Sequence, residues 1–303
     1  MRNKRDRFLR KGEKTPMRKI LILGVTGMLG HTLFRELSKN PEFDVWGTSR
    51  INHGLEKWFS PELLKKIRVN VLADNFDTVI RALASIQPDI VINCIGIIKQ
   101  IPEASDPLYA ITVNAQLPHR ISLVCKTARA RLIHISSDCV FSGNRGDYTE
   151  ADQSDAEDLY GRTKYLGEVY YPHCVTLRTS IIGPELKGKY GLVEWFLSQK
   201  GEINGYDRVI YTGFPTNELA KIISDYVIPN EKLTGLYHVS SEKISKYELL
   251  KIVAKEYEKE ITIHKDTKTF SDRSLVSERF KKETGYQPPD WVSLITSMKK
   301  AAY

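Results

Sequence analysis

Three side chains that together can protonate a carbonyl oxygen occur in order along this chain. Ser137 directly follows the apolar segment 131–136, and Tyr160 and Lys164 come later with the spacing Tyr-x-x-x-Lys. On a helix, residues four positions apart lie on one face. A cationic Lys164 would therefore stabilise the tyrosinate and lower the pKa of Tyr160. Tyr160 would protonate an oxygen that develops negative charge, and Ser137 would hydrogen-bond the same oxygen.

The Tyr-x-x-x-Lys spacing alone is weak evidence, because a chain with 15 tyrosines contains it by chance. Tyr247 and Lys251 have the same spacing, but no serine at the end of a core strand precedes them. We expect this second pair to lie on a solvated helix face. The position in the fold, and not the spacing, selects Tyr160.

A glycine-rich turn follows the first apolar segment and reads Gly24-Val25-Thr26-Gly27-Met28-Leu29-Gly30. Between a strand and a helix, such glycines permit a tight turn, approach of the backbone to a pyrophosphate, and close helix packing. We therefore expect a nicotinamide dinucleotide here, with Lys164 holding the ribose hydroxyls. The expected cofactor contacts are Gly24, Thr26, Gly27, Met28, Leu29, Gly30, Cys94, Ile95, Gly96, Tyr160 and Lys164.

The end of the second strand discriminates between the two nicotinamide cofactors. An acidic residue about 20 residues past the glycines would bind the ribose 2′-hydroxyl of NAD. This chain instead has Ser49 and Arg50, which can bind a 2′-phosphate by charge-assisted hydrogen bonds. We therefore favour NADP(H) over NAD(H). The alternative is that Arg50 only faces solvent.

Short β-rich segments alternate with helix-period segments over the first 180 residues, and several strands are apolar throughout. This alternation predicts an α/β fold with a doubly wound parallel (Rossmann) sheet. The expected strands are 19–23, 43–48, 67–71, 90–94, 131–136 and 174–178, and the expected helices are 31–39, 77–86, 115–128 and 159–171.

The regular alternation ends after Gly183. We expect residues 17–183, with about 217–258, to form the NAD(P)-binding domain. Residues about 184–216 and 259–303 would form a smaller, discontinuous C-terminal substrate lobe.

The net charge of +8 does not indicate a nucleic-acid partner, because residues 1–16 hold seven basic and two acidic residues. We expect this tail to be a disordered extension that precedes a natural start at Met17. No apolar run has membrane-spanning length, so no membrane partner is expected. The cysteines, Cys94, Cys125, Cys139 and Cys174, form no CxxC pair, which favours free thiols in a reducing cytoplasm. The scattered histidines indicate no metal site.

Further short segments complete an ordered pattern. They read Asn93-Cys94-Ile95-Gly96, Val113-Asn114-Ala115, Ser136-Ser137-Asp138-Cys139-Val140-Phe141-Ser142-Gly143, Arg178-Thr179-Ser180 and Gly213-Phe214-Pro215-Thr216. With the glycine turn and the Tyr160 segment, this set resembles the extended short-chain dehydrogenases/reductases, and among them the dTDP-4-dehydrorhamnose reductases. The resemblance implies NAD(P)H-dependent reduction of the 4-keto group of a nucleotide-activated deoxysugar, for cell-surface polysaccharide precursors. It implies catalytic places for Ser137, Tyr160 and Lys164, and cofactor contacts for Ser180 and Asn70.

The substrate side departs from the pattern of these reductases. Gln100–Ala104 replaces a Val-Asp-Lys-Ala-Glu stretch, Ile181 replaces an aromatic residue, and Asn70 replaces a common adenine-contacting Asp. The sugar and the nucleotide, dTDP or UDP, therefore stay open, as does the choice between monomer and homodimer. The expected substrate contacts are Gln100, Asp138, Ile181, Glu194, Trp195 and Tyr211.

Three other functions share this fold. The nucleotide-sugar 4,6-dehydratases need a glutamate where this chain has Cys139, so a dehydratase is not expected. A 4-epimerase would retain NAD, against which the missing acid after the second strand weighs mildly. A non-catalytic regulatory or binding subunit is the third alternative. The presence of Ser137, Tyr160 and Lys164 together, called the catalytic trio below, argues against it.

Overall fold

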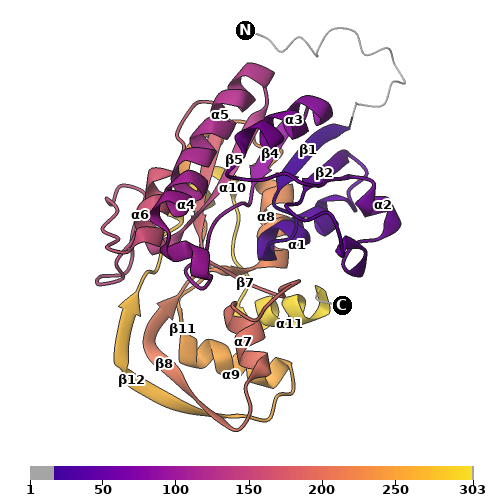
Figure 1. Cartoon of the computed structure of the whole chain (residues 1–303). Helices are drawn as coiled ribbons and strands as arrows, with labels where there is room; N and C mark the ends of the chain where they lie inside the picture. The colour runs from indigo at the N-terminus through magenta and orange to yellow at the C-terminus, as the bar shows by residue number, and fades with distance from the viewer. Residues whose placement is uncertain (1–16, 302–303) are drawn as a thin grey trace.

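The computed structural model describes residues 17–301, so the prediction about residues 1–16 lies outside the described part. Its centre is a seven-stranded sheet in which all neighbouring strands are parallel, with the order β10-β6-β5-β4-β1-β2-β3 (Figure 1). These strands are β1 (Arg18–Leu23), β2 (Phe43–Thr48), β3 (Ile67–Arg68), β4 (Ile90–Asn93), β5 (Arg131–Ser137), β6 (Cys174–Thr179) and β10 (Gly235–His238). The order turns back between β1 and β4, as in a doubly wound sheet. The predicted fold class is confirmed.

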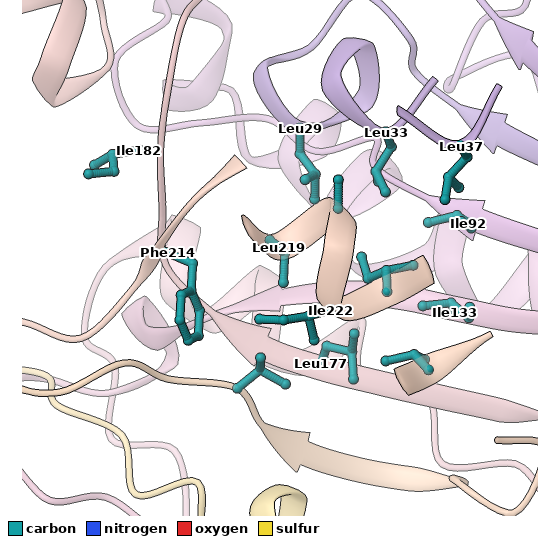
Figure 2. Packing of buried hydrophobic residues seen from close by; sticks show 14 of the residues in the cluster. Leu29, Leu33, Leu37, Ile92, Ile133, Leu177, Ile182, Phe214, Leu219 and Ile222 are labelled. Atoms are coloured by element: carbon teal, nitrogen blue, oxygen red, sulfur yellow. The ribbon is translucent and has the colours of Figure 1, made fainter. Parts of the chain in front are cut away.

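Helices cover both faces of the sheet because the apolar residues of its strands alternate in direction. Ile20 and Ile22 of β1 pack in one core with α1 (Met28–Leu37) and α8 (Thr216–Ile222). Figure 2 shows this side, where Leu29, Leu33 and Leu37 face Ile92 and Leu219. Leu21 and Leu23 point the other way, into a core with α3 (Phe76–Ile86) and α5 (Leu117–Ala128).

The remaining helices are α2 (Pro61–Leu64), α4 (Pro107–Ala110), α6 (Leu159–Leu166), α7 (Leu192–Ser198), α9 (Lys246–Glu256), α10 (Glu278–Thr284) and α11 (Trp291–Ala301). A π-helical turn at 111–116 joins α4 to α5. Within residues 17–301, no helix combines the length and the apolar character that crossing a membrane requires.

A three-stranded sheet with the order β11-β8-β12 forms a smaller lobe beyond the carboxyl ends of the large sheet (Figure 1). Its strands are β8 (Glu202–Tyr211), β11 (Ile244–Ser245) and β12 (Thr262–Asp272), and α9 packs on β8. The short strands β7 (Ile181–Ile182) and β9 (Phe214–Pro215) pair between the two sheets.

The packing divides the C-terminal half differently from the expected boundaries. Residues 217–238 join the large sheet through α8 and β10. Helix α9, expected there as well, lies on the small sheet because β11 and β8 supply its packing surface. Helix α10, expected in the smaller lobe, contacts β10, and helix α11, also expected there, contacts both α8 and α9. The chain therefore crosses between the lobes more often than its change of pattern indicates.

The glycine turn owes its geometry to one close backbone approach. A Cβ atom on Gly30, in the first turn of α1, would lie 2.1 Å from the carbonyl oxygen of Gly24. Gly24 itself has φ +87°, a conformation that favours glycine. Only a glycine at position 30 lets α1 begin directly against the end of β1.

We therefore expect Gly30→Ala to destabilise the protein by about 1–3 kcal/mol, because the methyl group would overpack against rigid backbone. Denaturant unfolding measures the effect. Gly27→Ala is the matched control, since its Cβ would meet the Gly24 carbonyl oxygen at an ordinary 3.5 Å. Equal stabilities of the two variants would contradict this account of the turn.

Candidate active site

A cavity of about 530 Å³ lies where the carboxyl ends of β1, β4, β5 and β6 face the smaller lobe. Its size is that of a small-molecule site. In open α/β sheets, ligands bind at this edge, next to the point where the strand order turns back. The glycine turn lines one side with Thr26, Gly27, Met28 and Leu29, while Tyr211, Lys246 and Arg273 line it from the smaller lobe.

Ser137, Tyr160 and Lys164 all line this cavity. Ser137 ends β5, where its Oγ accepts a hydrogen bond from the Cys139 N–H (3.1 Å) and donates one to Asp138 Oδ1 (3.1 Å). Lys164 Nζ donates to the Ile135 carbonyl (2.7 Å). The structure therefore brings together the three residues that the sequence predicted as a trio.

Tyr160 reaches this place because α6 begins at the right point and packs closely. Asp158 caps the helix by accepting a hydrogen bond from the Gly161 N–H (2.8 Å). A Cβ on Gly161 would lie 2.2 Å from the Cys139 carbonyl oxygen. The glycine after Tyr160 therefore allows the helix to lie directly against the end of β5.

The electrostatics of the pair differ from the expected ones. Burial, and then the neighbouring Cys139 thiol, raise the pKa of Tyr160, while Ser137 opposes this shift. Burial lowers the pKa of Lys164 to about 8, against the attraction of the Glu168 carboxylate. The expected lowering of the Tyr160 pKa by Lys164 is not seen, because burial of the phenol raises that pKa. Tyr160 is therefore protonated at neutral pH, as a proton donor must be.

Most of the predicted cofactor contacts share the cavity. Those that line it are Thr26, Gly27, Met28, Leu29, Cys94, Ile95, Gly96, Tyr160, Lys164 and Ser180. Gly24 and Gly30 do not line it and instead shape the turn. Burial raises the pKa of the Cys94 thiol to about 12, so this cysteine is a neutral part of the wall.

Three predicted cofactor contacts lie outside the cavity, at the ends of β2 and β3. They are Ser49 and Arg50, predicted to bind the 2′-phosphate of NADP(H), and Asn70. Ser49 is buried between these strands, where its N–H donates to the Arg68 carbonyl (2.9 Å). Arg50 and Asn70 are exposed beside it, and Asn70 turns the chain with φ 58°. This edge is adjacent to the glycine turn, since Gly24 N–H donates to Thr48 Oγ1 (3.1 Å).

The predicted substrate contacts divide into two groups. Gln100, Asp138, Ile181 and Tyr211 line the cavity. Glu194 and Trp195 do not, because α7 turns Val193 and Phe196 into the core and thereby directs the residues between them elsewhere. The preceding segment lines the cavity in their place, through Glu185, Leu186, Lys187, Tyr190, Gly191 and Leu192.

Four basic residues that line the site were not predicted from the sequence: Lys99, Lys187, Lys246 and Arg273. Lys99 Nζ forms an ion pair with Asp158 (2.6 Å) and lies 5.5 Å from the centroid of the Tyr160 ring. Its place directly before Gln100 was the only available signal. Lys246 and Arg273 belong to segments far apart in sequence, and no local pattern marks them. Among the described residues, no group of three or more His, Cys, Asp or Glu side chains could hold a metal ion.

A buried ion pair supports the trio from behind. Glu168 follows α6, and its carboxylate accepts hydrogen bonds from Arg178 Nε and Nη2, both at 2.7 Å. Ser136 Oγ (2.7 Å) and Tyr170 Oη (2.6 Å) donate to the same carboxylate. Burial alone would lower the pKa of Arg178, but Glu168 raises it, so the guanidinium keeps its charge in this ion pair. The pair joins β5, β6 and the end of α6.

This fold and this site define an extended short-chain dehydrogenase/reductase. Residues 17–302 match the family model described as RmlD substrate binding domain, and the chain belongs to that family. The predicted resemblance is therefore confirmed.

The solved structures that share the fold include the following two. A dTDP-4-dehydrorhamnose reductase from Bacillus anthracis, in complex with NADP, has a TM-score of 0.77 at 22% identity, covering 94% of this chain and 99% of that one. The enzyme WbmG from Bordetella bronchiseptica, in complex with NAD, has a TM-score of 0.73 at 18% identity, covering 97% and 96%.

A relative from Danio rerio is similar in sequence and is named as a subunit rather than as a reductase. It is methionine adenosyltransferase 2 subunit beta, which is 26% identical over 253 residues, covering 79% of this chain and 74% of the relative. One relative of this chain is thus named as a subunit of another enzyme.

We expect Arg178→Met to destabilise the protein by about 3–5 kcal/mol, because it leaves the Glu168 carboxylate buried without its partner. Urea unfolding measures the loss. The double variant Glu168→Gln/Arg178→Met removes both charges and should recover part of the stability. A double variant less stable than Arg178→Met would contradict this account.

Proposed function

We propose that the protein reduces the 4-keto group of a nucleotide-activated deoxysugar, with NADPH as the reductant. The observation that carries this proposal is the convergence of Ser137, Tyr160 and Lys164 in one cavity with the glycine turn. A trio without a cofactor site, or a cofactor site without a proton donor, would not support a reductase.

The residues of the turn fit a dinucleotide. Gly27 precedes α1 and offers no side-chain cap, and the first turn of α1 has no acidic residue. The N–H groups at this helix start can therefore bind a pyrophosphate, which the positive end of the helix also attracts. Met28 and Leu29 bring these groups to the cavity wall. Lys164, across the cavity, would hold the ribose hydroxyls.

The bound dinucleotide would supply a hydride to the carbonyl carbon. Tyr160, which carries its phenolic proton at neutral pH, would then donate it to the carbonyl oxygen. Ser137 would orient that oxygen through its hydroxyl, which now bonds Asp138. Lys164 would favour the transient tyrosinate by its positive charge, which the Glu168 carboxylate supports.

The preference for NADP(H) over NAD(H) rests on Ser49 and Arg50 at the end of β2. Arg50 is exposed and free to reach a 2′-phosphate, and no acidic residue stands at the end of this strand. One solved structure of this fold carries NADP and another NAD, so the fold accepts both.

The product would serve the synthesis of cell-surface polysaccharide precursors in the cytoplasm, and the protein would act as a monomer or homodimer. The nucleotide of the substrate would be dTDP or UDP. Cys139 supports reduction over dehydration, since burial raises its thiol pKa to about 11 and the neutral thiol cannot replace a carboxylate.

A regulatory role is the second candidate function, and the relative named methionine adenosyltransferase 2 subunit beta supports it. In that case the chain would bind a catalytic partner and its own cavity would turn over no sugar. The complete trio favours the reductase. An epimerase that retains NAD is a third candidate, which the missing acid after β2 disfavours.

We expect Tyr160→Phe to lower turnover roughly 10²-fold or more, because it removes the proton donor and leaves the cofactor site intact. NADPH oxidation with a 4-keto sugar nucleotide measures turnover, and fluorescence titration measures NADPH affinity. Tyr165→Phe is the matched control, since Tyr165 lies on the same helix and is 38% exposed. Full activity of Tyr160→Phe would show that Tyr160 is not the proton donor.

We expect Arg50→Ala to weaken NADPH binding by about 10-fold or more and NADH binding little, because only NADPH carries the 2′-phosphate that Arg50 would bind. Titration of both cofactors against the variant measures the two dissociation constants. Equal losses for NADPH and NADH would refute the assignment of Arg50.

A further inference from the structure

Lys246 stands in the wall of the cavity without a partner. It begins α9, where the positive end of the helix disfavours a cation. It lines the cavity from the smaller lobe. Its ammonium group forms no hydrogen bond or ion pair within residues 17–301. Burial lowers its pKa, and Arg273 lowers it further, while Asp138 and Cys139 oppose them. Lys246 is only partly buried, but an unpaired cation at a helix start that is partly withdrawn from water is still unfavourable unless a ligand compensates it.

Arg273, the residue that follows β12, lines the same cavity. Within the described residues its side chain makes one hydrogen bond, from Nε to the Phe141 carbonyl (2.8 Å). This bond fixes the guanidinium at the cavity wall and leaves its two terminal nitrogens available. Asp272, the adjacent acid, points to the other side, where Lys243 lies 3.7 Å from its carboxylate. The guanidinium of Arg273 is therefore held in place, but the neighbouring Asp272 carboxylate does not form an ion pair with it.

Positive charge exceeds negative charge around the cavity. The basic lining residues are Lys99, Lys164, Lys187, Lys246 and Arg273, and the acidic ones are Asp138 and Glu185. Lys99 is paired with Asp158 outside the cavity. Asp138 is the acid whose charge acts on both Lys246 and Arg273, and one carboxylate cannot neutralise two cations. Burial also raises the pKa of Asp138, which weakens its contribution.

We propose that Lys246 and Arg273 form an anion-binding subsite in the smaller lobe that holds an oxyanion of the substrate. The proposal rests on the proposed function in one respect, that the ligand is a nucleotide sugar. Two parts of such a ligand carry the required chemistry: the diphosphate, and a carboxylate on the sugar ring. Because the trio and this subsite border the same cavity, the anion would fix the sugar relative to Tyr160.

Binding measurements with Lys246→Met and Arg273→Met test the subsite without any need for turnover. Calorimetry with UDP, dTDP, UDP-glucose and UDP-glucuronate, each in the presence of NADP, gives the affinities. Lys251→Met is the matched control, because Lys251 lies on the same helix, is 51% exposed and pairs with Glu248. NADPH affinity, measured in each variant, reports whether the cofactor half of the site is intact.

We expect each subsite variant to lose about 10-fold or more in affinity for the anionic ligand, since hydrogen bonds to charged groups are among the strong ones. A loss for UDP or dTDP themselves identifies the diphosphate as the anion. A loss confined to UDP-glucuronate, with UDP and UDP-glucose unchanged, identifies a sugar carboxylate. Lys251→Met should bind every ligand as the unchanged protein does.

Unchanged affinities in both variants, with NADPH binding retained, would overturn the subsite. Failure of the unchanged protein to bind any of the four nucleotides would also overturn it. The reductase proposal can be contradicted independently of the subsite. If the protein reduces no 4-keto sugar but its affinity for an anionic ligand depends on Lys246, the reductase proposal is wrong and the subsite is supported.

Discussion

The buried ion pair between Glu168 and Arg178 is the interaction on which the site depends. Both side chains are almost fully buried, so their removal from water is costly and only complete hydrogen bonding offsets it. The structure meets that condition: Ser136 and Tyr170 also donate to the carboxylate, and Arg178 Nη1 lies 3.2 Å from His238 Nε2. The pair therefore fastens the central strands β5 and β6 to β10 and to the end of α6.

The same interaction sets the chemistry in front of it. Ser136, which bonds Glu168, directly precedes Ser137, and Lys164 is one helical turn before Glu168. The carboxylate raises the pKa of Lys164 against the larger effect of burial. One buried pair thus fixes two members of the trio in space and helps to keep the lysine charged.

A second polar anchor holds the opposite wall. Asn114 lies in the π-helical turn at 111–116, a kind of distortion that is frequent at functional sites. Its side chain accepts a hydrogen bond from the Ile97 N–H (2.8 Å) and donates to the Ile97 carbonyl (3.1 Å). It also lies 3.4 Å from Thr163 Oγ1 on α6. The segment after β4 and the helix that carries Tyr160 are therefore held by one buried amide.

The sequence predicted those parts of the molecule whose cause is local. Apolar periodicity located most strands and helices of the large sheet. The glycines at 24, 27 and 30 located the turn, where the positive φ of Gly24 and the close backbone approach at Gly30 disfavour other residues. The trio could be predicted because each member sits at a defined end of a strand or helix. Tertiary placement could not be predicted: α7 turns Glu194 and Trp195 away from the cavity, while Lys246 and Arg273 enter it from distant segments. The raised pKa of Tyr160 also depends on burial, which the spacing to Lys164 does not encode.

The central claim is that this cavity reduces a sugar carbonyl. The most direct test incubates the protein with NADPH and a panel of dTDP- and UDP-linked 4-keto sugars, and follows the nicotinamide absorbance together with the sugar product. The account predicts that at least one sugar is reduced, with one NADPH consumed for each product molecule. Binding of NADPH without oxidation by any sugar of the panel would contradict it and would favour the regulatory role.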